Sequence, residues 1–251
     1  MAKIIAIHSF RGGTGKSNTT ANIAALLAAE GRRVGVIDTD IQSPGIHVLF
    51  GLHGDTIDHS LNDYLWGKCS IQQTAHPVLA GVVSGQVFLM PSSIKADAIV
   101  QVLRQGYDMQ LLTTAFRELI DTLKLDVLLI DTHPGLNEET LFALAIANVL
   151  VIVLRPDQQD YEGTGVALGV ARALDVPQMR LVVNKAPADY DLAAIKTHVE
   201  QTFDCPVAAV LPHSDEMMKL ASSDIFALRY PDHPLTAALR EVAAQVTLIS
   251  P

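Results

Sequence analysis

The chain has 251 residues, of which 49% are hydrophobic and 18% charged, and its formal net charge at pH 7 is −9. These values are typical of a globular protein with a sizeable core, and the acidic balance argues against a general attraction to nucleic acid or anionic lipid. Its two cysteines, Cys69 and Cys205, lack paired metal-ligand spacing, which favours a reducing cytoplasm. We therefore expect one domain over residues 1–251 in the cytoplasm, and the first apolar run is too short for a leader or membrane span.

A strand, a glycine-rich loop and a helix come first in the chain. Residues 3–8 form an apolar run that predicts a buried strand, and residues 18–30 predict a helix that Gly31 ends. The loop between them reads Phe10-Arg11-Gly12-Gly13-Thr14-Gly15-Lys16-Ser17. In this context glycines let backbone N–H groups point at phosphate oxygens, and the helix N-terminus adds positive potential. We expect Lys16 to neutralise the β- and γ-phosphates and the Ser17 hydroxyl to join a Mg²⁺ shell.

The general phosphate-loop pattern has a glycine at position 10, where this chain has Phe10. The variant Lys-Gly-Gly-x-Gly-Lys-Thr/Ser fits instead, with Arg11 in place of its first lysine. On these residues the chain resembles the ParA/MinD family of deviant P-loop ATPases, which position DNA, septa and protein assemblies in bacteria. The resemblance implies ATP and Mg²⁺ as cofactors. It also implies nucleotide contacts at Gly12, Gly13, Thr14, Gly15, Lys16, Ser17 and Asn18.

A second buried strand, residues 33–38, ends in the sequence Asp38-Thr39-Asp40. Two carboxylates at the carboxyl end of a strand beside a phosphate loop lie where open α/β sheets bind ligands. The resemblance implies that Asp40 orients or activates the attacking water and that Asp38 sits near Mg²⁺ and the γ-phosphate. A structural alternative is that Asp38 caps the strand and Asp40 caps the following turn.

The middle of the chain carries a further carboxylate. Residues 61–66 suggest a short helix, residues 87–91 a strand and residues 107–123 an amphipathic helix. Next comes an apolar run that ends in Asp131, and a carboxylate there holds Mg²⁺, usually through water. Pro134-Gly135 then bends the chain, and such a bend can respond to a γ-phosphate. His133 departs from the family's pattern, so a contact with phosphate or partner and a plain loop position both stay open.

The last part of the chain alternates strands and helices. Strands are predicted at residues 149–154, 180–185 and 207–211, and helices at residues 161–174, 191–203 and 235–249. Together with the resemblance, this pattern predicts an α/β fold, a mostly parallel twisted sheet with helices on both faces, as in P-loop NTPases of the ParA/MinD type. Asn184 falls where the family places an adenine-reading asparagine, although an asparagine that ends a strand in a turn would look the same. Pro212 falls in the family's stretch of backbone beside the base.

The resemblance further implies a slow, partner-stimulated ATPase that sandwiches ATP between two protomers of a homodimer. Because the first lysine of the variant loop crosses to the partner's phosphates, we hypothesise that Arg11 acts as an arginine finger. The alternative is an intramolecular salt bridge of Arg11.

Such a dimer would position a cargo by cycling on a DNA or membrane surface, with an activating adaptor protein. The candidate DNA-binding bases are Arg172, Arg180, Lys196, Lys219, Arg229 and Arg240, and isolated surface bases are the default explanation for each. The predicted last helix has a single base and gives no support for a membrane-binding tail. A soluble ATP-dependent ligase or a nucleotide-switched scaffold of the same fold stays open as an alternative.

Overall fold

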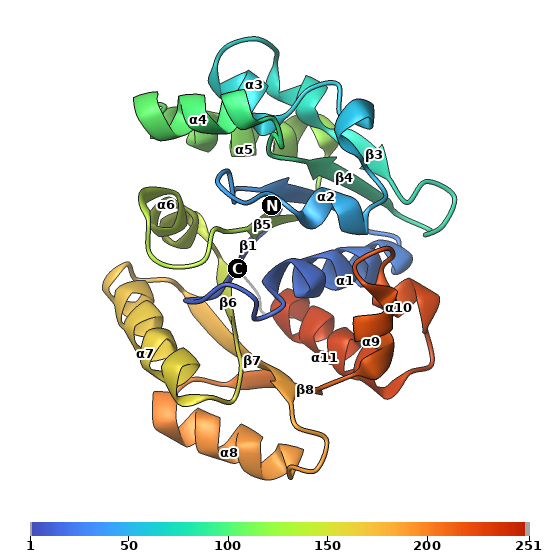
Figure 1. The fold of residues 1–251 in the computed structure, drawn as a ribbon, viewed down its shortest axis with the longest axis vertical. Helices are drawn as coiled ribbons and strands as arrows, with labels where there is room; N and C mark the ends of the chain where they lie inside the picture. The colour runs from blue at the N-terminus through green and yellow to red at the C-terminus, as the bar shows by residue number, and fades with distance from the viewer. Residues whose placement is uncertain (1, 249–251) are drawn as a thin grey trace.

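A computed structural model describes residues 2–248. Its centre is one eight-stranded twisted sheet with the strand order β3-β4-β2-β5-β1-β6-β7-β8 (Figure 1). Neighbouring strands are parallel except β3 and β4, which pair antiparallel at one edge. The strands are β1 (Lys3–His8), β2 (Arg33–Asp38), β3 (His76–Val78), β4 (Gln86–Met90), β5 (Val127–Asp131), β6 (Val149–Leu154), β7 (Gln178–Ala186) and β8 (Val207–Pro212).

Helices cover both faces of the sheet, as Figure 1 shows. On one face lie α1 (Lys16–Ala29), α2 (Ile46–Leu49), α9 (Asp215–Leu220), α10 (Phe226–Arg229) and α11 (Pro234–Leu248). On the other lie α3 (Leu61–Leu65), α4 (Ala96–Gln105), α5 (Met109–Leu123), α6 (Glu138–Ile146), α7 (Gln158–Ala173) and α8 (Leu192–Phe203). Two 3₁₀ turns, Gly54–Thr56 and Ile71–Thr74, complete the connections. None of the helices in residues 2–248 has the length and apolar character needed to cross a bilayer.

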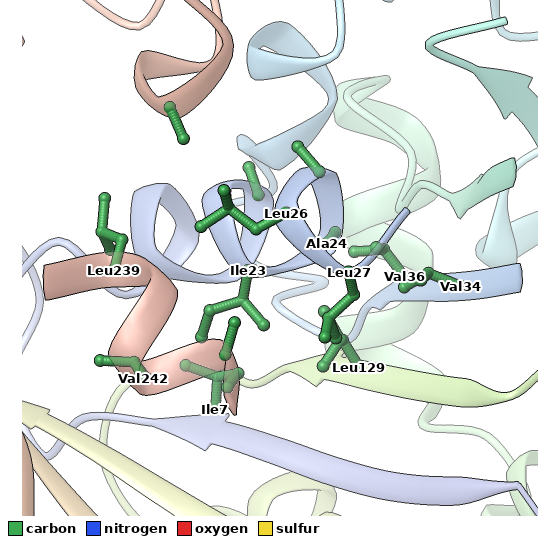
Figure 2. Close-up of a cluster of buried hydrophobic side chains, with 14 of the residues drawn as sticks. Ile7, Ile23, Ala24, Leu26, Leu27, Val34, Val36, Leu129, Leu239 and Val242 are labelled. Atoms are coloured by element: carbon green, nitrogen blue, oxygen red, sulfur yellow. The ribbon is translucent and has the colours of Figure 1, made fainter. Parts of the chain in front are cut away.

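Strand alternation explains why there are two cores. In β1, Ile5 and Ile7 point to the α1 face while Ala6 points to the opposite face, because successive side chains of a strand alternate. The helix α1 is enclosed between the sheet and α11, and Ile23 and Leu27 are fully buried there (Figure 2). A helix buried on most sides must be apolar almost all round, which accounts for its run of Ala, Ile and Leu. This packing fixes the start of α1, and with it Lys16.

The sequence-based prediction of the fold class is confirmed, but several elements were missed. Helices α2, α4, α6, α9 and α10 and the edge strand β3 were not predicted, because each has ten residues or fewer and offers few turns or alternations to recognise. The helix predicted over residues 107–123 begins at Met109, since the Asp108 side chain accepts the backbone N–H of Gln110 as an N-cap. The predicted end of the last helix, Ile249, lies outside the described residues.

One close contact joins the glycine-rich loop to α7. Gly163 of α7 faces the ring of Phe10, and a Cβ added there would lie 2.2 Å from Phe10 Cδ1 and 2.8 Å from Phe10 Cβ. A contact so near the backbone cannot be relieved by a small rotation of the ring. Glycine at this position therefore lets α7 approach the loop closely.

We expect Gly163→Ala to lower the free energy of unfolding by about 1–2 kcal/mol, because overpacking outweighs the gain in helix propensity. Gly169→Ala in the same helix is the matched control, since a Cβ there would meet nothing within 4 Å. It should raise stability by roughly 0.5–1 kcal/mol. Urea unfolding of both variants measures the difference, and equal stabilities would contradict the packing argument.

Candidate functional site

The glycine-rich loop lies at the carboxyl edge of the sheet, between β1 and α1. Gly13 and Gly15 have φ values of +79° and +96°, a region that favours glycine. A Cβ on Gly15 would also lie 2.3 Å from Asn184 Nδ2, so this position has no room for a side chain. Gly15 is the N-cap of α1, and the free N–H groups of the first turn of α1 are where a phosphate binds. Ser17, half-buried in that turn, lies where the sequence placed it.

A buried ion pair joins the loop to β5. Lys16 Nζ lies 2.9 Å from Asp131 Oδ1, and the two residues are 6% and 1% exposed. Thr20 Oγ1 is a second neighbour of the same carboxylate oxygen, at 3.0 Å. A buried charge is costly unless it is paired, so the loop lysine and the strand-end carboxylate stabilise each other.

Asp38 adds a second carboxylate to this pair. It is fully buried, and β2 and β5 pair so that Asp38 lies opposite Asp131. Its Oδ1 accepts the backbone N–H of Asp40 at 2.9 Å, while Oδ2 has no hydrogen-bond partner among the described residues. Burial, followed by repulsion from Asp131, raises the pKa of Asp38 well above its usual range.

This cluster passes a test for Mg²⁺ binding. Asp38 and Asp131 carry two negative charges when ionised and Lys16 carries one positive charge, so the ionised cluster has an uncompensated negative charge. Within this cluster, Asp38 Oδ2 is a buried carboxylate oxygen without a hydrogen-bond partner among the described residues, and carboxylate oxygens are ligands that Mg²⁺ prefers. The donor set Ser17, Asp38 and Asp131 therefore fits the ion, with remaining positions left to water and phosphate oxygens.

Asp40 lies further out, next to His133. Its Oδ1 accepts the backbone N–H of Ser43 at 3.1 Å, and His133 Nε2 lies 3.8 Å from the same oxygen. Burial raises the pKa of Asp40, although less than that of Asp38. Asp40 and His133 thus come together from separate loops, which the sequence did not predict.

A pocket of about 240 Å³ opens beside the loop. Asn184 Nδ2 donates to the carbonyl of Thr14 at 2.7 Å, and Lys185 Nζ donates to the carbonyl of Gly13 at 2.8 Å. The end of β7 is therefore tied to the glycine-rich loop by two side chains. The pocket is lined by both polar and apolar groups, among them Asn18, Asn184, Pro212, Met217, Leu235 and Leu239. A space of this size and character suits one flat base rather than a whole ligand.

Arg11 forms ion pairs within its own chain. Its Nη1 lies 3.4 Å from Asp160 Oδ1 and 3.7 Å from Asp157 Oδ1, and its side chain is 39% exposed. Asp160 also accepts the backbone N–H and the guanidinium of Arg155. Burial raises the pKa of Asp160, but the bonds from Arg155 outweigh it and lower the pKa overall. This geometry matches the intramolecular alternative that the sequence left open for Arg11.

Comparison with known proteins identifies the family. A family model described as an AAA domain matches residues 2–175, more than half of the chain. The septum site-determining protein MinD of Synechocystis is 25% identical over 221 residues, which cover 87% of this chain and 79% of that protein. This chain belongs to the ParA/MinD family of P-loop ATPases.

Other comparisons agree with this membership. An uncharacterized ATP-binding protein of Methanocaldococcus jannaschii is 28% identical, with 98% of this chain and 88% of that protein covered. The septum site-determining protein MinD of Pyrococcus horikoshii, solved in complex with Mg-ADP, superposes with a TM-score of 0.82 at 21% identity, covering 98% and 96% of the two chains. At that identity the structural likeness shows the shared fold.

The ParA/MinD motifs gather at one edge of the sheet, but several of their neighbours were missed, Thr20 and Asp157 among them. Arg155, Asp160, Lys185 and Met217 contact or line the site. Lys185 directly follows the predicted Asn184, so its position at a strand end was a usable signal. Asp160 gave no signal, because it lies 149 residues from Arg11 in the chain.

At pH values above the raised pKa of Asp38, we expect Asp38→Asn to raise the free energy of unfolding of the nucleotide-free protein by about 1–2 kcal/mol, because the wild type then holds an unpaired buried charge. It should also abolish Mg²⁺-dependent ATP turnover. An acid with a raised folded-state pKa binds its proton more tightly in the folded state, so the wild type loses stability as pH rises through that pKa. Thermal unfolding between pH 5 and 8 checks both points, and a less stable variant would contradict them.

Proposed function

We propose that this chain hydrolyses ATP to ADP and phosphate at the carboxyl edge of its sheet, slowly and under the control of a partner. The observation that carries the proposal is the buried group Lys16, Asp38 and Asp131, together with a base-sized pocket lined by Gly15 and Asn18 on either side of Lys16 and Ser17 in the chain. In a nucleotide the base and the terminal phosphates lie at opposite ends. The pocket would hold the base, and the charged group would hold the phosphates. The fold that this chain shares with MinD structures supports the same order.

Each residue has a role in this proposal. Lys16 binds the β- and γ-phosphate oxygens in place of Asp131, and the backbone of residues 12–15 encloses the phosphates. Ser17, Asp38 and Asp131 hold Mg²⁺, which supplies charge neutralisation to the phosphates when bound. Asp40 orients the attacking water from the outer rim of the site, where it is less deeply buried than Asp38. Asn184 and the backbone at Pro212 hold the adenine.

We expect Lys16→Ala to reduce ATP turnover by more than about 100-fold, because a main source of transition-state charge stabilisation is lost. Lys68→Ala is the control, since Lys68 is exposed and pairs with Asp63 away from the site. Phosphate release and ATP binding by calorimetry provide the measurement. If a folded Lys16→Ala protein binds and splits ATP like the wild type, the proposed site is wrong.

Arg11 links hydrolysis to assembly in the second part of the proposal. In the family arrangement two protomers close around ATP, and Arg11 would reach the partner's phosphates as a finger. To do so it must leave Asp157 and Asp160. Asp160 keeps its bonds from Arg155 when Arg11 leaves, so release strands no buried charge. Dimer formation then competes with a modest intramolecular ion pair, and this competition accounts for slow basal turnover.

The surface on which the dimer works is proposed to be nonspecific DNA in the cytoplasm, with an adaptor protein that stimulates turnover. The candidate bases divide between the two faces of the sheet. Arg172 and Lys196 lie on α7 and α8, whereas Lys219, Arg229 and Arg240 lie on α9, α10 and α11. Arg172 also donates to the carbonyls of Phe203 and Asp204. The three exposed bases on α9, α10 and α11 lie on one face of the sheet, so this face is the one we propose for contact with DNA.

We expect wild type with ATP to form dimers that sediment with plain duplex DNA, and Arg11→Ala to do neither, because the finger is lost. Light scattering and co-sedimentation measure the two steps, with anionic liposomes as the parallel surface. Arg32→Ala is the matched control, since Arg32 is equally exposed and pairs with Glu30 beyond the far end of α1.

Two results would contradict this part of the proposal. An ATP-dependent dimer of Arg11→Ala that equals the wild type would exclude the finger. A dimer that binds neither DNA nor liposomes would favour a soluble ligase or scaffold.

A further inference from the structure

His8 is a buried imidazole beside the site that the proposed mechanism does not use. It is the last residue of β1, directly before the glycine-rich loop, and it is fully buried. Strand alternation places it on the same face as Ala6, opposite to Ile7. A histidine at a strand end inside a core needs hydrogen-bond partners to offset its desolvation.

The bonds around His8 fix its tautomer. His8 Nδ1 lies 2.9 Å from Thr132 Oγ1, and Thr132 Oγ1 lies 3.1 Å from the carbonyl oxygen of Ile7. The Thr132 hydroxyl donates to the carbonyl of Ile7, and a hydrogen on Nε2 of His8 would be a buried donor without a partner among residues 2–248. Nδ1 of His8 must then carry the hydrogen and donate it to Thr132. The ring is neutral, because burial and then Lys16 and His133 lower the pKa of His8 to about 3.

The other ring nitrogen makes no contribution. Nε2 of the Nδ1–H tautomer is a bare acceptor, and it has no hydrogen-bond partner within residues 2–248. The polar function of His8 therefore lies in the single bond to Thr132. An asparagine places a donor near the position of Nδ1 and lacks a counterpart of Nε2, so it is a close functional substitute.

Thr132 is the first residue after the carboxylate that ends β5. It directly follows Asp131, at the point where the backbone leaves β5 and starts the loop to Gly135. Its backbone N–H donates to the carbonyl of Ile7 at 3.2 Å, and the N–H of Gly135 donates to the carbonyl of Ser9 at 3.1 Å. These two bonds join the loop after Asp131 to the end of β1 and to Ser9, next to the glycine-rich loop. The His8–Thr132 bond is a third link between the same two segments.

We propose that His8 is a positioning residue: its bond to Thr132 holds the backbone after Asp131 in place, and so sets the Asp131 carboxylate for Mg²⁺. This proposal rests on the proposed function in one respect: it takes the ligand of the site to be a nucleotide with Mg²⁺. The hydrogen bond itself and the tautomer are independent of it. Partners of this outer kind are expected to change metal affinity by about 10–100-fold when removed.

The first test reads the tautomer directly. In the full chain with ¹⁵N-labelled histidine and no nucleotide, the His8 resonances, assigned by their loss in His8→Asn, should show a protonated Nδ1 and a bare Nε2. Thr132→Val, which keeps the shape of the side chain and removes the acceptor, should shift the Nδ1 resonance. A protonated Nε2, or resonances unmoved by Thr132→Val, would overturn the proposal.

The second test measures how ADP binding depends on Mg²⁺ concentration, by calorimetry. Thr132→Val and His8→Leu should need about 10–100-fold more Mg²⁺ for half-maximal enhancement of ADP binding, with ADP affinity in the absence of Mg²⁺ unchanged. Thr132→Ser and His8→Asn, which restore the hydroxyl and the donor, should return the Mg²⁺ requirement to within about threefold of the wild type. Thr236→Val is the control, because this buried threonine lies in α11 and bonds to Tyr230.

These readouts separate the inference from the proposed function, since neither requires turnover. A wild type that binds Mg-ADP and hydrolyses nothing would refute the proposed ATPase, while the two tests still decide the role of His8. A Thr132→Val protein with the wild-type Mg²⁺ requirement, or ADP binding in the wild type that ignores Mg²⁺, would overturn the positioning role.

Discussion

The buried group formed by Lys16, Asp38 and Asp131 is the constraint on which the rest of the site depends. These side chains sit at the ends of adjacent strands and at the start of α1, where almost no water reaches them. One lysine cannot balance two ionised carboxylates there, and this imbalance, together with burial, is why the pKa of Asp38 is raised. The enclosure of α1 between the sheet and α11 keeps the lysine in this position (Figure 2).

Much of this arrangement follows from the order of residues along the chain. A glycine-rich loop after a strand, and aspartates at the ends of two other apolar runs, must meet at one sheet edge if the strands are parallel, and Asn184 joins them by the same rule. Periodicity could not reveal contacts such as His8 with Thr132 or Arg11 with Asp160, because more than 120 residues separate each pair. Short helices such as α6 were missed for a different reason: nine residues give too few turns for a clear pattern.

Arg11 illustrates how an exposed charge can serve as a weak latch. Its carboxylate partners differ, since the Asp157 side chain is 42% exposed whereas Asp160 is buried and bound to Arg155 as well. An exposed pair of this type contributes about 0–1 kcal/mol, so the latch can be opened by a modest competing interaction. Replacing the family's lysine by arginine adds a planar fork that can bridge two oxygens at once. The same fork suits two carboxylates within the chain or phosphate oxygens across an interface.

The antiparallel edge strand β3 has a consequence for how copies of this protein can associate. It is three residues long, and its central residue, Pro77, has no backbone N–H to offer a neighbouring strand. An edge strand that is short and has a proline at its centre is a poor template for extending the sheet from one molecule into the next. Continuous sheets running through several molecules, and the fibrils they seed, are thereby disfavoured at this edge. At this edge, self-association is left to contacts between side chains, which can form and break reversibly.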